Sequence, residues 1–484
     1  MTTMSIDVDP TATPAPGSSP DPFLAGGWEP VHDELVTEDL AVTGALPAGL
    51  SGAYLRNGPN PAFAPLGAYH LFDGDGMVHA VEIQDGRARY RNRWIQSKGL
   101  EVERRAGHAI FGGLSDFRMP PEDVMAEVGP LKNTANTHVW RHAGRIFALM
   151  EAGRPTEISP ELETLGEYTF DDLLQGPMTA HPKTDPETGE LLFFGYSPFP
   201  PFVRLHVADA AGRLVTSVPV DLPAAVMMHD FAVSRDRVVF FDLPAVFDVQ
   251  ALIAGGAGIR WEPSNGARIG VLGRADLNAP VRWFDMDPFW MFHVLNAHDD
   301  GDAVVVEGCR APRLNVAFGD EELGEPVRPM LHRWRIDLAA GRVTEEALDD
   351  RAGDFPRLND DHAGLPARYG YVANPRSWGE TKVAFEGVVK HDLVAGTSVV
   401  HSYGPTALAG EAAFAPDPDR STEDGGWLLN FVYDEADGTS ALVVVDAEAM
   451  EEVARVHLPR RVPLGFHGNW LAAGAQGNNH YPGA

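Results

Sequence analysis

The segment 181–196, HPKTDPETGELLFFGY, decides the fold. It contains a polar residue, a short turn rich in Asp and Gly, and then a continuous apolar run. The same order recurs in HDFAVSRDRVVFFDL from His229 and in HVLNAHDDGDAVVVEG from His293. A turn that leads into a short apolar run predicts a hairpin with one deeply buried strand. The segment is therefore one unit of a repeat.

Further copies of this unit, with looser turns, begin at Thr137, Asp354, Glu411 and His467. The copies follow one another at about 55 residues, a period typical of closed rings of blades. Between them lie hairpins such as LHVADAAGRLVTSVPV (205–220), which alternate apolar and polar residues as half-buried outer strands do. Four strands per repeat predict an all-β fold, a seven-bladed β-propeller whose N-terminal strands close the ring.

The domain organisation follows from composition. Residues 1–22 are rich in Pro, Ser, Thr and Ala, which predicts a disordered N-terminal tail, and 23–484 are predicted to be a single propeller domain. A short helix is expected at Pro121–Glu127. The apolar segment 243–261 interrupts the repeat, and such loop and short-helix insertions would form a cap on one face. This segment is either a packed loop or an apolar lip that touches lipid or guides an apolar substrate.

Charge and cysteine content exclude several classes. The net charge of −31 and the pI of about 4.8 oppose nucleic-acid binding, which needs basic residues. The one cysteine, Cys309, allows no intrachain disulfide and favours a reducing compartment. The N-terminus does not have the pattern of a signal peptide, and no apolar run is long enough to span a bilayer. We expect a cytoplasmic protein, with peripheral contact at the inner membrane surface through 243–261. Nothing in the sequence sets the oligomeric state.

Equivalent strand-start residues of a propeller converge on its axis, so the repeat predicts a metal site. Structural zinc sites favour cysteine, and non-haem iron often uses two His and a carboxylate. An all-imidazole site suits Fe(II) that keeps positions open for O2. Acidic residues in the repeat would accept hydrogen bonds from the second ring nitrogens. The predicted ligands are His181, His229, His293 and His467, and the predicted acids are Glu151, Asp354 and Glu411.

Thr137 holds an axial position without offering a ligand. Its methyl group would cover one coordination position, or it is an ordinary strand residue. His138, His298, His391 and His401 lie out of phase with the repeat and are predicted to be ordinary core or loop residues. Aromatic residues near the repeats are candidates for a substrate tunnel: Phe72, Trp140, Phe199, Phe202, Phe292 and Phe466.

Several segments carry a resemblance: YLRNGPNP (54–61), FDGDGMVH (72–79), NTANTHV (133–139), TAHPKTDPETGEL (179–191), MMHDFAVS (227–234), FHVLNA (292–297), DFPRLN (354–359), EDGGWLL (423–429) and PLGFHGNW (463–470). From about residue 28 to 470 the chain resembles the carotenoid cleavage oxygenase family, and actinobacterial members read closest. The resemblance implies a seven-bladed propeller with Fe(II) held by the same four histidines, and the same three acids as hydrogen-bond partners of those histidines. Asp354 stands where the family usually has Glu, so it is expected to reach its histidine through water or a shifted backbone. Thr137 matches the family threonine beside the iron.

The resemblance implies oxidative cleavage of a C=C bond by O2 to aldehyde or ketone products. One branch of the family grips phenolic stilbenes or phenylpropenes with a Tyr and a Lys, where this chain has Leu114 and Met150. The missing anchors favour a carotenoid or apocarotenoid, and stilbene-type alkenes remain the alternative. A propeller serving as a protein-interaction platform would not need axial imidazoles. A metal-dependent hydrolase or lactonase would favour oxygen ligands.

Overall fold

The computed structural model describes residues 21–254, 256–314, 316, 327–377, 384–473 and 480–481. The tail expected at 1–22 therefore lies outside the described residues, except for its last two. Within the described ranges, no helix is both long and apolar enough to cross a membrane.

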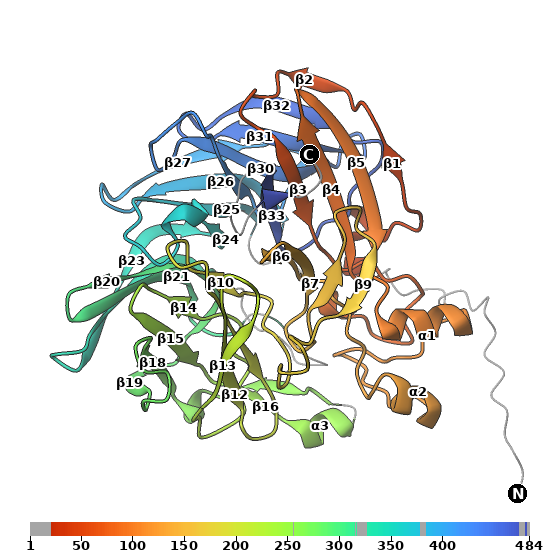
Figure 1. Ribbon diagram of the computed structural model, residues 1–484. Coiled ribbons are helices and arrows are strands. Elements are labelled where there is room, and N and C mark those ends of the chain that lie inside the picture. Colours follow the sequence, from red (N-terminus) through yellow and green to blue (C-terminus); the bar gives the residue numbers. More distant parts are fainter. Residues whose placement is uncertain are drawn as a thin grey trace, which may run out of the picture.

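The described strands form seven blade sheets around a common axis (Figure 1). The all-β, seven-bladed prediction is confirmed. Three of the four-stranded blades come first along the chain. The first consists of β6 (His138–His142), β7 (Arg145–Leu149), β8 (Thr156–Ile158) and β9 (Thr164–Glu167). The second consists of β10 (Lys183–Thr184), β11 (Leu191–Tyr196), β12 (Val203–Ala208) and β13 (Leu214–Val220). The third consists of β14 (Ala232–Val233), β15 (Arg237–Asp242), β18 (Ala267–Gly273) and β19 (Arg282–Met286).

Three more blades continue the ring. The fourth consists of β20 (Trp290–Asp300), β21 (Ala303–Ala311), β22 (Met330–Asp337) and β23 (Arg342–Ala352). The fifth consists of β24 (Asp354–Arg357), β25 (Tyr369–Ser377), β26 (Ala384–Asp392) and β27 (Thr397–Ser402). The sixth consists of β28 (Ala407–Leu408), β29 (Ala413–Pro416), β30 (Gly426–Asp434), β31 (Thr439–Asp446) and β32 (Glu451–His457), with β2 (Val42–Gly44) at its outer edge.

The last blade closes the ring by pairing the two ends of the chain. Its inner strand β33 (Gly468–Ala473) lies antiparallel to β3 (Gly52–Arg56), with Tyr54 opposite Trp470. The sheet continues through β4 (Met77–Gln84), β5 (Arg87–Trp94) and β1 (Val36–Thr37), and β34 (His480–Tyr481) lies parallel to β33. The predicted closure by N-terminal strands is confirmed, and the radial arrangement leaves only the short outer edge of each blade unpaired.

The turns between outer strands explain the recurring Asp and Gly. The amide of Gly341 donates to the carbonyl of Asp337 at 2.9 Å, and Gly396 donates to Asp392 at 2.8 Å. Both glycines have positive φ, 68° and 66°, which costs a residue without Cβ little. The Met450 amide makes the equivalent bond to the Asp446 carbonyl. Its φ of 58° is strained, because Met450 has a side chain.

The core lies between neighbouring blades. Every residue of β11 is buried, and the rings of Phe194 and Phe231 meet edge to face at 5.2 Å across two blades. Each such buried ring contributes about 1.5–3 kcal/mol to stability. This packing fixes the start of each inner strand relative to the axis.

The insertions gather on one side of the ring, where Figure 1 shows all three α-helices. Helix α1 (Lys98–Ala106) begins at Ser97, whose hydroxyl accepts from the Leu100 amide, and ends at Gly107 in the left-handed conformation. The predicted helix at Pro121–Glu127 is α2 (Glu122–Glu127). Segment 243–261 forms β16 (Ala245–Phe247), α3 (Val249–Ile253) and β17 (Ile259–Trp261). Short 3₁₀ turns complete the elements: η1 (Pro22–Leu24), η2 (Gly26–Trp28), η3 (Leu71–Asp73), η4 (Pro263–Asn265) and η5 (Asp360–His362).

Candidate metal centre and substrate cavity

The four predicted histidines meet on the propeller axis. One ligand atom from each, in His181, His229, His293 and His467, lies within 4.8 Å of every other. His181, His229 and His467 directly precede or come shortly before β10, β14 and β33, and His293 lies near the start of β20. All four side chains are buried. The repeat therefore delivers the imidazoles to one point because each starts an inner strand.

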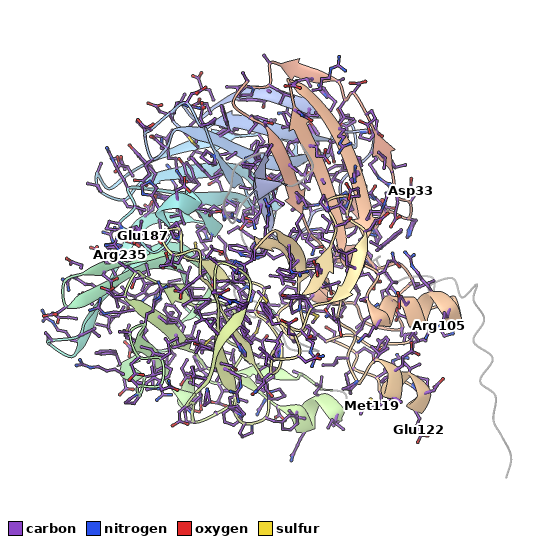
Figure 2. All side chains as sticks on the ribbon, viewed as in Figure 1. Asp33, Arg105, Met119, Glu122, Glu187 and Arg235 are labelled. Carbon is purple, nitrogen blue, oxygen red and sulfur yellow. The ribbon has the colours of Figure 1, made fainter. Side chains whose placement is uncertain are left out.

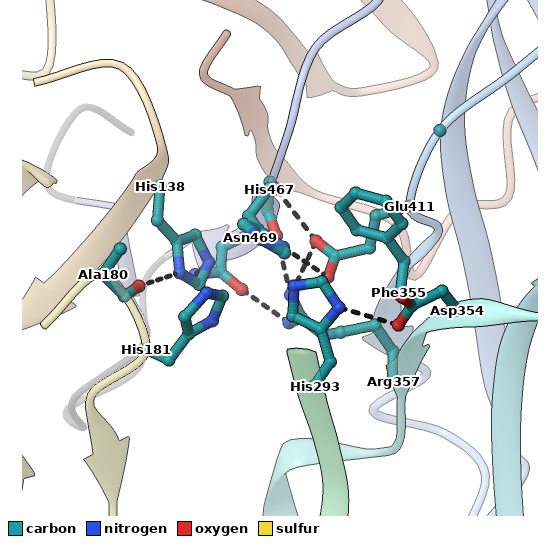
Figure 3. Close-up of polar contacts among 12 residues, drawn as sticks. His138, Ala180, His181, His293, Asp354, Phe355, Arg357, Glu411, His467 and Asn469 are labelled. Carbon is teal, nitrogen blue, oxygen red and sulfur yellow. Dashed lines mark hydrogen bonds and ion pairs between the residues drawn. The ribbon is translucent and has the colours of Figure 1, made fainter. Parts of the chain in front are cut away.

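Three of the imidazoles are oriented by carboxylates. The Nδ1 atoms of His293 and His467 donate to Asp354 Oδ1 at 2.8 Å and to Glu411 Oε1 at 3.0 Å (Figure 3). His229 Nδ1 also lies in contact with a carboxylate oxygen, Glu151 Oε1. A neutral imidazole that carries its proton on Nδ1 has a lone pair on Nε2. These three Nε2 atoms are therefore free to bind a cation.

The spacing of the Nε2 atoms fits a bound cation. His229 Nε2 lies 3.0 Å from His181 Nε2 and 3.2 Å from His293 Nε2. Lone pairs at this separation repel one another unless a cation lies among them. Burial, followed by the neighbouring imidazoles, lowers the pKa of His181 and His467 well below the ordinary value, which keeps both rings neutral as metal ligands must be. Burial alone would lower the pKa of His293, but the Asp354 carboxylate raises it.

Asp354 reaches its histidine directly, so of the two expected routes, water or a shifted backbone, the contact does not need the water. The register of β24 against β25 shifts between Asp354 and Arg357, and Phe355 has φ 53°. This local bulge moves the shorter carboxylate toward His293, and the Phe355 amide also donates to Asp354 Oδ1 at 2.8 Å. The ring of Phe355 then stacks on His293 at 4.9 Å. The contact is thus made where the backbone register is shifted.

Two of the acids have further partners that the sequence did not indicate. The hydroxyl of Tyr196 donates to Glu151 Oε2 at 2.9 Å. Arg357 Nη1 and the Gly468 amide donate to Glu411 Oε2 at 3.1 and 3.0 Å. Tyr196 ends the apolar run of its hairpin, so its sequence position suggested only core packing.

His138 lies beside the cluster but is not free to join it. Its Nδ1 donates to the Ala180 carbonyl at 2.7 Å, and its Nε2 accepts from the Asn469 side-chain amide at 3.1 Å (Figure 3). Both ring nitrogens are therefore occupied. Thr137 lines the large cavity described next, and its hydroxyl donates to Asn136 Oδ1 at 3.0 Å.

A cavity of about 840 Å³ opens from the cluster under the cap. His229, His293 and His467 border it, as do Leu114, Met150 and residues of segment 243–261. Its walls are mainly apolar side chains, which suits an apolar small molecule. The aromatic residues on its walls are Phe23, Trp28, Phe63, Tyr69, Phe72, Phe111, Phe117, Tyr196, Phe247, Phe292, Phe355, Phe385 and Phe466.

The six aromatic tunnel candidates divide into two groups. Phe72, Phe292 and Phe466 line the cavity; Phe72 meets Phe466 at 5.6 Å, and Phe292 lies 4.8 Å from His229. Trp140 instead borders a separate cavity on the axis, where its indole donates to Thr184. Phe199 is 64% exposed, and Phe202 packs on the core of neighbouring blades. These last three residues do not line the large cavity: Trp140 lies on the inner strand β6, and Phe199 and Phe202 lie in the bend between β11 and β12.

The fold and the site define a metal-binding propeller with an apolar cavity at its metal centre. Residues 28–472 match the family described as "Retinal pigment epithelial membrane protein". The carotenoid cleavage oxygenase of Mycobacterium tuberculosis is 37% identical, with 93% of this chain and 98% of that protein covered. The carotenoid 9,10(9',10')-cleavage dioxygenase of Crocus sativus is 36% identical, with 93% and 89% covered.

Solved structures agree with these relatives. The lignostilbene dioxygenase of Pseudomonas brassicacearum superposes with a TM-score of 0.86 at 29% identity, covering 93% of this chain and 98% of that one. The cobalt-substituted Synechocystis ACO gives 0.82 at 26% identity, covering 92% and 98%. The chain belongs to the carotenoid oxygenase family and is an oxygenase.

Proposed function

We propose that this protein is a non-haem Fe(II) dioxygenase that cleaves a C=C bond of a carotenoid or apocarotenoid with O2, giving aldehyde or ketone products. The observation that carries the proposal is the set of four imidazoles whose ligand atoms lie within 4.8 Å of one another, three of them at the wall of a large apolar cavity. Fe(II) would supply activation of O2, because a polyene offers neither a proton to remove nor a group to protonate. Neutral imidazoles are suitable ligands for iron.

The residues of the chain position the reactants. His181, His229, His293 and His467 would hold the iron, and Glu151, Asp354 and Glu411 fix three of these rings through Nδ1. Thr137 borders the same cavity as three of the ligands, and we assign it the shaping of the oxygen position. The apolar walls exclude water and hold one bond of the substrate over the metal.

The cavity favours an apolar polyene over a phenolic alkene. Leu114 and Met150 lie in its wall where the stilbene branch is expected to place a Tyr and a Lys. The sulfur of Met150 accepts from the Thr134 amide at 3.2 Å. Lys132 also borders the cavity, but its ammonium is held at 2.8 Å from Asp75 and 2.7 Å from Glu103. Its charge is thus already neutralised and poorly placed to bind a phenol.

Stilbene-type cleavage is the second candidate, because a lignostilbene dioxygenase shares the fold at a TM-score of 0.86. It is the weaker candidate, because the cavity wall has Leu114 and Met150 in place of the Tyr and Lys that would bind a phenol. The test is to incubate the Fe(II) protein under ¹⁸O₂ with β-carotene, an apocarotenal and resveratrol, and to identify products by mass spectrometry. We expect labelled carbonyl products from a carotenoid or apocarotenal and none from resveratrol. Cleavage of resveratrol alone would overturn the substrate assignment.

A matched pair of variants tests the metal ligands. His293→Ala should lose most of the iron. His298→Ala removes an imidazole from the same strand β20 but outside the cluster, and should keep about one iron per chain, as expected for a closed ligand set. Stoichiometric zinc or calcium in place of iron would overturn the oxygenase chemistry proposed here.

We also infer that residues 23–484 act as one propeller domain in the cytoplasm and touch the inner membrane surface through 243–261. Segment 243–261 borders the cavity through Phe247, Val249, Leu252 and Ile259. Ile253 on α3 is 68% exposed, and Met119, labelled in Figure 2, is 60% exposed. Exposed apolar side chains beside an apolar cavity favour delivery of a substrate from lipid. Sedimentation with anionic vesicles should fall for Ile253→Asp; unchanged binding would count against this contact.

A further inference from the structure

The propeller axis contains a second cavity, of about 370 Å³, that reaches the same histidine cluster. We call it the axial channel. Many of its lining residues come shortly after the axial residue of a blade: 182–187, 232–235, 294–297, 356–361, Phe414 and Trp470. The channel therefore runs along the inner strands. His181, His293 and His467 border it.

The metal centre is thus approached from two cavities, and the axial channel has more charged side chains in its wall than the large cavity. His293 and His467 border both cavities, His229 borders the large one, and His181 borders the axial channel. The large cavity has mainly apolar walls, and a hydrated divalent cation would lose hydration free energy on crossing it. Acids that border that cavity are held by partners: Lys132 pairs with both Asp75 and Glu103.

The axial channel carries an excess of acidic groups. Six carboxylates and four cationic side chains line it. Each cation lies 2.6–3.1 Å from a different lining acid: Lys183 from Asp230, Arg274 from Asp185, Arg235 from Glu187, and Arg357 from Glu411.

Two carboxylates, those of Asp360 and Asp361, remain beyond these four pairs. Asp360 is 3.8 Å from the shared guanidinium of Arg357, and its side chain is 39% exposed. Asp361 is the next residue in η5 and is also exposed. Figure 2 labels Glu187 and Arg235, an exposed pair of the channel wall. A water-accessible passage with surplus negative charge attracts cations and raises their rate of arrival.

We propose that the axial channel is the route by which a hydrated divalent cation reaches the four histidines, with Asp360 and Asp361 attracting it and His181 meeting it from the channel side. This inference rests on the metal centre proposed above. It separates the path of the metal from that of the apolar substrate. Loading of the metal is then independent of what occupies the large cavity.

The test measures the rate of metal uptake rather than activity. The full chain is depleted of metal with a chelator and mixed with Co(II) or Fe(II) in a stopped-flow instrument; Co(II) binding is followed by its visible absorbance. For the double variant Asp360→Asn/Asp361→Asn we expect uptake about tenfold slower at low ionic strength, with a smaller difference at high salt. The final metal content should stay at the wild-type value.

A control variant and a blocking experiment make the result specific. Asp116→Asn removes an acid that borders the large cavity and pairs with Arg118 at 2.6 Å, and it should load at the wild-type rate. Uptake should also be unchanged when β-carotene, detected by its own absorbance, already fills the large cavity under anaerobic conditions.

Each outcome separates the two proposals. Normal metal content with unchanged rates in the double variant, or uptake blocked by bound β-carotene, would overturn the axial route while leaving the metal centre intact. A wild-type protein that takes up neither metal would overturn the metal centre itself and the route with it.

Discussion

Replacing Tyr196 by Phe should weaken iron binding without disturbing the fold. The Tyr196 hydroxyl donates to Glu151 Oε2 at 2.9 Å, and the other carboxylate oxygen contacts His229 Nδ1. The ring itself is buried and lies 5.6 Å from Phe247, a contact that Phe would keep. A hydrogen bond to a charged group contributes about 1.5–3 kcal/mol. Part of that loss falls on the metal-free protein as well.

We therefore expect iron to bind about tenfold more weakly, which corresponds to about 1.4 kcal/mol. Competition against a calibrated chelator gives the dissociation constant, and plasma emission gives the iron content. Tyr371→Phe is the matched control, because Tyr371 is buried and its hydroxyl has no hydrogen-bond partner within the described part of the chain. It should leave the constant unchanged.

A double-mutant cycle with Glu151→Gln tests how Tyr196 acts. If Tyr196 works through Glu151, the two changes are not additive, and the double variant binds iron about as weakly as Glu151→Gln alone. A Tyr196→Phe protein that binds iron within twofold of wild type would refute this reasoning. Full additivity in the cycle would refute the stated path.

Three further outcomes follow. Asp354→Glu should bind iron more weakly in the same competition assay. Asp354 already reaches His293 at 2.8 Å, and an extra buried methylene costs about 1–3 kcal/mol. Tighter binding would contradict this. Leu114→Tyr with Met150→Lys should add resveratrol cleavage measurable by chromatography, and no gain would show that other walls exclude phenols. Burial lowers the pKa of His206 to about 4. As pH falls from 6.5 toward 4, His206 takes up a proton in the unfolded chain before it does so in the folded one, so the free energy of unfolding decreases. Denaturant titrations of His206→Phe should show a slope of this free energy against pH that is smaller by up to about 1.4 kcal/mol per pH unit. An unchanged slope would contradict this.

The repeat and its axial residues could be predicted because their signal is local. A polar residue, a turn and an apolar run are readable within a dozen or so residues, as at His181 and His229. Ring closure turns this local order into one meeting point, so the four imidazoles converge as expected. The short helix after Pro121 was readable for the same reason, from its own sequence.

Features that depend on contacts between distant segments could not be read in this way. The bond between His138 and Asn469 joins residues 331 positions apart. The direct reach of Asp354 depends on a bulge and on φ 53° at Phe355, neither of which has a sequence signal as clear as glycine. Trp140 was expected in the substrate tunnel and borders the axial channel instead, since the two cavities share the same axis and strand direction decides between them.

The central claim is that one iron ion binds the four imidazoles, and anomalous diffraction tests it most directly. Data collected from crystals of the purified protein above and below the iron absorption edge should give one strong peak, about 2.0–2.2 Å from Nε2 of His181, His229, His293 and His467, as for other metal–imidazole bonds. A peak that bonds to fewer than three of these atoms, or one that persists below the iron edge, would contradict the account.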